Sequence, residues 1–164
     1  MNKPYIKLIK LSTILFVVGF IFFGYTNFAE AATKTWDGST SGSWSVGTNW
    51  SGDIAPVTGD DLVFPNGASN LSNTNDLTEN TIFNSITFSG NGYTLSGNRI
   101  ILGQGLAGIT DSVSSGGNEI ALDIRVDVTR DIVVSNSGET LTISGRISGT
   151  GGLNKEGVGK LVLS

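Results

Sequence analysis

A charged cluster near the middle of the chain comes closest to a pattern that could perform acid–base chemistry. Asp123, Arg125 and Asp127 alternate with apolar residues, and Arg130 and Asp131 follow directly. In an extended strand, alternate residues share one face, and the carboxylates of Asp123 and Asp127 would lie about 13 Å apart. Glycoside hydrolysis needs two carboxyl groups closer than about 10 Å. We therefore interpret this cluster as a charged, solvated strand face.

A second group of carboxylates raises the question of a metal. Asp60 and Asp61 follow Gly59, and Asp53 lies a few residues earlier. Carboxylate oxygens are suitable ligands for Ca²⁺, but these residues lack the regular Asp/Gly spacing of calcium-binding repeats. We expect a solvated turn at this place, and we expect the chain to bind neither a metal nor a cofactor.

The three tryptophans of the chain lie close together at Trp36, Trp44 and Trp50, among Asn and Asp residues. Aromatic rings beside such polar groups could form a stacking platform for sugar rings. The alternative is that the rings are buried and pack over the first layer of the fold, which is the more common fate of tryptophan side chains. We favour burial and keep ligand stacking as the second interpretation.

Composition excludes several classes of chemistry. The chain has no Cys and no His, which removes thiolate nucleophiles, thiolate metal sites and imidazole bases. Gly is abundant and only 15% of residues are charged, which is typical of a β-rich protein with many tight turns. The chain is acidic overall, with a net charge of −4, which argues against nucleic acid as a partner.

The amino-terminal segment has the pattern of a secretory signal peptide. Lys3, Lys7 and Lys10 form a basic start, an apolar run follows over 11–28, and Ala29-Glu30-Ala31 is a small-x-small site. We predict a signal peptide over residues 1–31, cleaved between Ala31 and Ala32. The apolar run approaches the length of a membrane span, so a retained anchor is the alternative. Either outcome requires the export machinery.

The remaining chain divides into two parts. Residues 32–75 are aromatic and rich in loops, and we predict that they form an amino-terminal cap containing a short strand at 62–64. Residues 76–164 contain short apolar runs bounded by Gly or Asn, which are typical of strands. The runs are at 86–88, 93–95, 99–102, 120–128 and 132–134. Strict alternation over 120–128 predicts one half-buried strand, and the Gly/Ser-rich residues 103–118 predict a loop.

Two repeats indicate stacked coils. Leu141-Thr142-Ile143-Ser144 recurs 20 residues later as Leu161-Val162-Leu163-Ser164, and the pattern of 94–97 recurs 48 residues later at 142–145. The second spacing fits two coils of about 24 residues each. Stacked coils bury one continuous apolar column, whereas a single coil cannot hide its apolar face. Because the chain stops inside a strand at Ser164, we expect a truncated carboxyl end whose open coil could support self-association.

The carboxy-terminal residues closely resemble the autotransporter-associated β-strand repeat, also called the passenger-associated transport repeat. The match runs from the apolar strand at Leu141 through 147–153 (Ile-Ser-Gly-Thr-Gly-Gly-Leu), Lys155 and the Gly157-Val158-Gly159 turn to a second strand at Leu161. The tryptophan-rich opening also resembles the start of secreted proteins that carry this repeat. The resemblance implies an all-β fold, a right-handed parallel β-helix, exported as a passenger domain to the surface of a bacterial cell.

From these observations we expect a non-catalytic scaffold, either secreted or displayed at the cell surface in association with the outer membrane. A stalk or adhesin-like role would bring it into contact with cell-surface glycans, or with the surface of a host or neighbouring cell. Two alternatives stay open. The chain could be the amino-terminal part of a β-helical polysaccharide-degrading enzyme with catalytic coils beyond Ser164. It could also be a carbohydrate-binding module built on the tryptophan segment.

Overall fold

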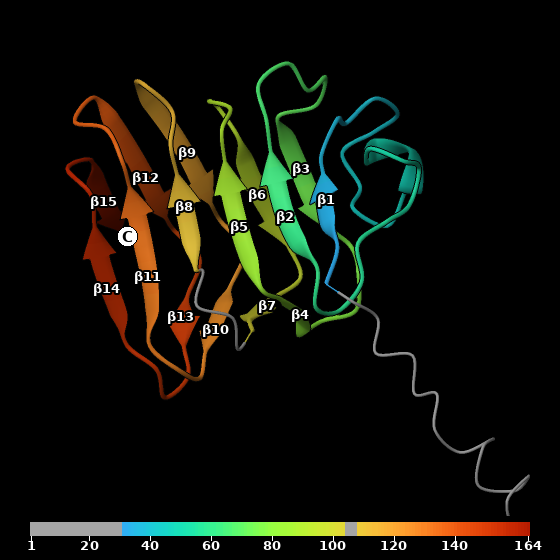
Figure 1. Cartoon of the computed structure of the whole chain (residues 1–164). Coiled ribbons are helices and arrows are strands. Elements are labelled where there is room, and N and C mark those ends of the chain that lie inside the picture. Colours follow the sequence, from blue (N-terminus) through green and yellow to red (C-terminus); the bar gives the residue numbers. More distant parts are fainter. Residues whose placement is uncertain (1–30, 104–107) are drawn as a thin grey trace, which may run out of the picture. The chain divides into compact units, whose positions relative to one another are not determined.

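The computed structural model describes residues 31–103 and 108–164. The predicted signal peptide therefore lies outside the described residues, except for Ala31 at its end. The described part is all-β, and its strands form three parallel sheets (Figure 1). The fold class predicted from the sequence, a parallel β-helix, is confirmed.

The first sheet contains, in order, β1 (Thr33–Thr35), β2 (Asp61–Phe64), β5 (Ser85–Phe88), β8 (Ile109–Asp111), β11 (Arg130–Val134) and β14 (Leu153–Glu156). The second contains β4 (Thr81–Phe83), β7 (Ile100–Leu102), β10 (Ile124–Val126) and β13 (Ile147–Ser148). The third contains β3 (Ser72–Asn75), β6 (Thr94–Gly97), β9 (Gly116–Ile120), β12 (Glu139–Ile143) and β15 (Lys160–Leu163). A short 3₁₀ helix, η1, spans Gly47–Asn49.

The chain visits the three sheets in rotation. From β2 onward, each coil places one strand in the first sheet, one in the third and one in the second, and then begins the next coil. About four turns are completed in this way. Each strand inside a sheet thus lies beside strands of the preceding and following coils, so its backbone groups pair in both directions, whereas the strands at the ends of a sheet have one neighbour.

The strand register explains both sequence repeats. Leu141 of β12 lies directly beside Leu161 of β15, as the shift of 20 residues predicts. Leu95 lies beside Ile120, and Ile120 lies beside Ile143. The similar segments at 94–97 and 142–145 therefore occupy the same sheet two coils apart, and this prediction is confirmed.

The core consists of columns of equivalent side chains. Leu62, Ile86, Ile109 and Ile132 are register partners in the first sheet, and all four are completely buried. Period-two alternation explains this, because every second residue of a strand points to the same face. The aromatic residues occupy the first coils, and aliphatic residues fill the later ones.

Two of the predicted elements are wrong in their boundaries. Residues 120–128 do not form one strand: β9 ends at Ile120, a corner follows, and β10 begins at Ile124. The alternation persists because Leu122 also points inward from the corner, where the backbone N–H groups of Ala121 and Leu122 both donate to the Leu95 carbonyl. The predicted loop at 103–118 contains β8 and the start of β9, since pairing with both neighbouring coils outweighs the weak strand propensity of Gly and Ser.

The segment 32–75 contains β1, β2 and β3, and an irregular stretch between β1 and β2 lies against the outer edge of β3. Ser43 forms a parallel bridge with Thr74, and the Trp44 N–H donates to the Thr74 carbonyl at 3.0 Å. Trp36 and Trp50 form an antiparallel bridge with each other. The N–H and the carbonyl of Thr74 on the outer edge of β3 are therefore both paired, which makes them unavailable to another chain.

Candidate functional site

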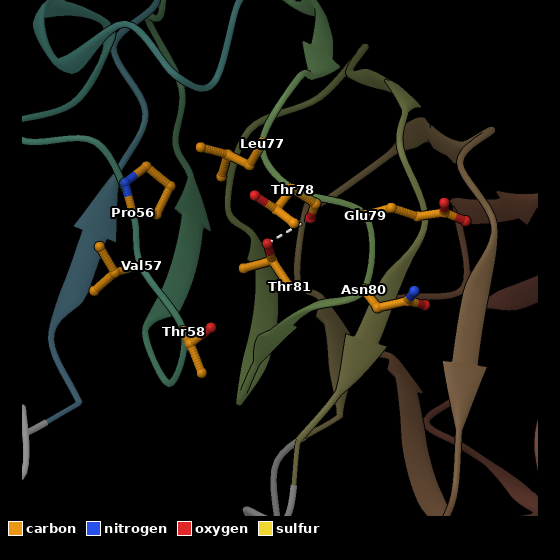
Figure 2. A pocket seen from close by; sticks show the side chains of 8 residues that line it. All are labelled: Pro56, Val57, Thr58, Leu77, Thr78, Glu79, Asn80 and Thr81. Carbon is orange, nitrogen blue, oxygen red and sulfur yellow. Dashed lines mark hydrogen bonds between the residues drawn. The ribbon is translucent and has the colours of Figure 1, made fainter.

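A groove of about 390 Å³ lies at the start of the second sheet, beside β4. Figure 2 shows that two short segments face each other across it. One carries Pro56, Val57 and Thr58, and the other carries 77–81 (Leu, Thr, Glu, Asn, Thr). The N–H of Gly59 donates to the Ile82 carbonyl at 2.9 Å, which fixes the first segment against the edge of β4.

Hydrogen bonds hold the second wall of the groove in a tight turn. Thr81 donates to the Thr78 carbonyl both from its backbone N–H, at 3.1 Å, and from its hydroxyl, at 2.6 Å (Figure 2). Asn80 has a φ of 68°, a left-handed conformation that Asn tolerates better than most residues. Arg99, from the next coil, donates to the Asn80 side chain at 2.7 Å and forms an ion pair with Glu79 at 3.2 Å.

The groove is lined mainly by neutral polar and apolar side chains. Glu79 is the only ionisable residue among the eight that line it, and Arg99 pairs with its carboxylate. Hydrolysis of a glycosidic bond needs two carboxyl groups at a controlled separation. The threonine hydroxyls and the Asn80 amide can instead form hydrogen bonds with a ligand, while Pro56 and Leu77 offer apolar surface.

The tryptophans proposed for ligand stacking lie elsewhere and are inaccessible. Trp36, Trp44 and Trp50 are completely buried, with ring centroids 5.0 to 6.0 Å apart in edge-to-face contacts. A sugar-stacking platform needs an exposed ring face. The stacking interpretation is therefore wrong, and the rings instead pack together with Phe64 of the first coil.

Three residues of the central charged cluster, Asp123, Arg125 and Asp127, take part in exposed ion pairs. Arg125 pairs with Asp127 at 2.9 Å, and Arg146 of the next coil pairs with Asp123 at 3.3 Å. All four side chains are at least a third exposed. The Asp123 and Asp127 carboxylates are thus each paired with an arginine, which is the arrangement expected of a solvated face.

The other two residues of the cluster differ from this. Asp131 accepts a hydrogen bond from the Asn154 amide at 3.1 Å, and Arg130 is only 3% exposed. The interpretation as a solvated strand face is therefore wrong for Arg130, whose side chain points into the coil with those of Ile132 and Val134.

Two of the three carboxylates considered for calcium accept hydrogen bonds from protein donors. Asp60 accepts backbone N–H groups from Ala32 and Val57, and Asp61 accepts the Ser85 hydroxyl at 2.5 Å. Asp53 is exposed and adopts a φ of 58°. Within the described ranges, no group of three or more acidic residues is placed to hold a metal ion.

Sequence reasoning missed a buried acidic pair, Asp111 and Glu139, in the interior of the third coil and the fourth. Both are at most 1% exposed, and Asn118 donates to the two carboxylate oxygens of Asp111 at 3.0 and 3.1 Å. Burial, a hydrogen bond with the Glu139 side chain and the charge of Glu139 raise the pKa of Asp111 to about 7. The position of Asp111 two residues after the inward-facing Ile109 could have indicated that Asp111 also points inward. Both residues lie in the segment that we predicted to be a loop.

Comparison of the chain with family models, with curated proteins and with solved structures gives no match. The class of protein therefore rests on the fold itself, which is a parallel β-solenoid. In the parts of the chain that the structure describes, no helix is long and apolar enough to cross a membrane.

Proposed function

We propose that this chain is an exported β-helical scaffold, a passenger or stalk that carries no catalytic site of its own. The observation that carries the proposal is the stacking of β12 on β15, with Leu141 beside Leu161. This places the two strand segments of the passenger-like repeat one above the other as successive coils. Such a repeat extends a rod by adding one coil at a time, and nearest-neighbour contacts stabilise each addition.

The predicted signal peptide supports an exported location. A basic start, an apolar run and an Ala-x-Ala site precede the first described strand. The absence of cysteine in the chain means that folding outside the cytoplasm needs no disulfide formation. On this proposal, the partners are the export machinery during synthesis and cell-surface glycans or a neighbouring cell surface afterwards. Self-association through the strands of the last coil is part of the same proposal.

Cell fractionation tests the export proposal. The full chain and a variant lacking residues 2–31 should be expressed in a bacterial host with an outer membrane, and the periplasm, membrane and medium should be analysed. We expect the full chain outside the cytoplasm and the variant inside it. Cytoplasmic retention of the full chain would contradict the proposal.

Carbohydrate binding is the second candidate function. The groove beside β4 is the better candidate binding site, because the three tryptophans are buried. Binding of the exported protein to a glycan array should be compared with that of Thr78→Arg, which fills the groove from an exposed position. Thr150→Arg, at another exposed threonine far from the groove in the sequence, is the matched control. Loss of binding in the Thr78 variant alone would support this role, and no binding by the parent protein would exclude these glycans.

A further inference from the structure

The first residue after the predicted cleavage site is held by the fold. The backbone N–H of Ala32 donates to Oδ1 of Asp60 at 3.1 Å, and the Ala32 carbonyl accepts the N–H of Asp61 at 2.9 Å. Ala32 precedes β1, and its neighbour Thr33 is the register partner of Asp61. The nitrogen at the predicted cleavage site is therefore fixed beside one particular carboxylate.

Asp60 is a buried acidic residue, only 2% exposed. Its second carboxylate oxygen accepts the N–H of Val57 at 2.9 Å, and its own carbonyl accepts the N–H of Asn84 at 3.0 Å. Asp60 has no part in the ion pairs formed among the described residues. A buried carboxylate supported by neutral donors alone gains strongly from a positive charge placed at hydrogen-bond distance.

We propose that cleavage between Ala31 and Ala32 creates the missing partner, so that processing and folding of the β-helix are coupled. Hydrolysis of this peptide bond by the signal peptidase consumes one water and leaves a carboxylate on Ala31 and an ammonium group on Ala32. The ammonium group then forms an ion pair with the Asp60 carboxylate in place of a neutral hydrogen bond. This inference rests on the proposed export of the chain, and it assigns Asp60 as the receptor of the new amino terminus.

The pairing has a structural consequence for the first coil. Ala32 leads into β1, the outermost strand of the first sheet, and Asp60 immediately precedes β2, its only neighbour in that sheet. An ion pair between them fastens the end of β1 to β2. The first coil is then more stable in the mature chain than in the precursor, which favours completion of the fold after the signal peptide has been removed.

Exported protein from four versions of the full-length gene provides the test. The versions are the parent, an insertion of one Gly between Ala31 and Ala32, Asp60→Asn, and the two changes together. The insertion keeps the Ala32 amide as a donor but moves the ammonium group one residue away from Asp60. Urea unfolding at pH 7 should show that each single change lowers the folding equilibrium constant about tenfold, while the combination costs no more than Asp60→Asn alone.

Asp53→Asn is the matched control, because Asp53 is exposed in the same segment and Asn tolerates its positive φ. This control should leave the unfolding midpoint unchanged. The proposal would be overturned if the insertion left the folding equilibrium constant unchanged. It would also be overturned if the free-energy costs of the insertion and of Asp60→Asn were additive in the combined variant.

The pH dependence gives a second readout. The ionisable residues on β1 and β2 are Lys34 and Asp61, and Asp60 directly precedes β2. An α-amino group ordinarily titrates at about 7.7–8.0, and pairing with Asp60 should raise this value in the folded state. Its stabilising contribution is therefore complete below pH 7 and is lost as the pH rises through the folded-state pKa. An amine that titrates at its ordinary value in the folded protein would contradict the pairing.

The mass of the exported protein separates the two proposals. Exported protein that begins at a residue other than Ala32 would overturn the coupling and leave the export proposal intact. An unprocessed chain retained in the cytoplasm would overturn both.

Discussion

At the scale of single residues, polar side chains inside the column tie neighbouring coils together. Asn73, Asn75 and Asn118 are at most 3% exposed. Asn73 accepts the indole N–H of Trp44 at 2.7 Å, and Asn75 donates to the Asn98 carbonyl at 2.7 Å. Because buried polar groups are costly when unpaired, each of these bonds penalises a shift of one coil relative to the next.

Among the polar residues of 32–75, we expect Asn49 to contribute most to the free energy of unfolding. It is completely buried, accepts the N–H groups of Thr40 and Ser41, and donates to the Ser41 hydroxyl and the Ser43 carbonyl. Asn49→Ala leaves these groups without their partner and should lower the free energy of unfolding by about 2–3 kcal/mol. Urea titration measures this, with Asn66→Ala at an exposed turn as the control. Equal stability of the two variants would contradict the assignment.

The Asp111–Glu139 pair should make stability depend on pH near neutrality. The pKa of Asp111 is raised from 3.8 to about 7 in the folded state, mainly by burial. The folded chain therefore keeps a proton that the unfolded chain has already released, and stability falls as the pH rises from 4 through about 7. Asp111→Asn removes this titration and should flatten the profile over that interval.

Urea midpoints at several pH values between 4 and 8 measure the Asp111 effect. The informative quantity is the difference between the parent and the variant, because other carboxylates titrate in both. If the difference in urea midpoint between the parent and the variant stayed constant from pH 4 to pH 8, it would contradict the raised pKa of Asp111.

At the scale of strands and corners, glycine sets how closely the coils can approach. A Cβ atom at Gly145, in the corner after β12, would overlap the carbonyl oxygen of Leu122 in the coil before it. Gly145→Ala should therefore cost about 1–3 kcal/mol. At Gly138, the nearest atom to a new Cβ lies 3.4 Å away, so Gly138→Ala should cost much less. Thermal unfolding of the two variants tests this difference, and equal costs would contradict the close approach at the corner.

The sequence was sufficient to predict the elements whose apolar residues alternate and recur. The strand at 132–134 follows from its short apolar run, and the stacking of the strands at 141–143 and 161–163 follows from the repeat spacing. The corner after Ile120 was not predictable in this way, because Leu122 points inward and continues the alternation. Inward orientation alone does not distinguish a strand from a corner of a β-helix.

The candidate site was much less predictable than the fold. The groove forms where Pro56–Thr58 meets the turn before β4, and no sequence pattern brings these segments together. The burial of Asp60 was missed for a similar reason, since a Gly-Asp-Asp run reads as an exposed turn. Its environment depends on Ala32, which reaches it only through the pairing of β1 with β2.

At the scale of the whole molecule, the tryptophan cluster should determine the stability of the first coils. Trp44 is completely buried, contacts Trp50, Phe64 and Phe83, and donates its indole N–H to Asn73. Trp44→Ala should lower the free energy of unfolding by about 3–5 kcal/mol. Ile54→Ala, at a side chain that is 61% exposed in the same segment, should change it by less than about 0.5 kcal/mol.

Hydrogen exchange of the Trp44 variant locates the effect within the molecule. In a solenoid, coils are stabilised by their immediate neighbours, so loss of protection should be greatest in β2 and β3 and smallest in β12 and β15. Uniform loss along the chain would contradict this nearest-neighbour account.

The measurement that tests the central claim most directly is labelling of a single introduced cysteine in intact cells. The chain has no cysteine, so Thr150→Cys, at an exposed position, provides one thiol for a membrane-impermeant maleimide. Leu141→Cys, at a completely buried position, is the control and should react only after denaturation. We predict that Cys at position 150 is labelled on intact cells or in the medium. Labelling confined to the periplasm after the outer membrane alone is permeabilised would support export without surface display, and labelling only after the inner membrane is broken would contradict an exported scaffold.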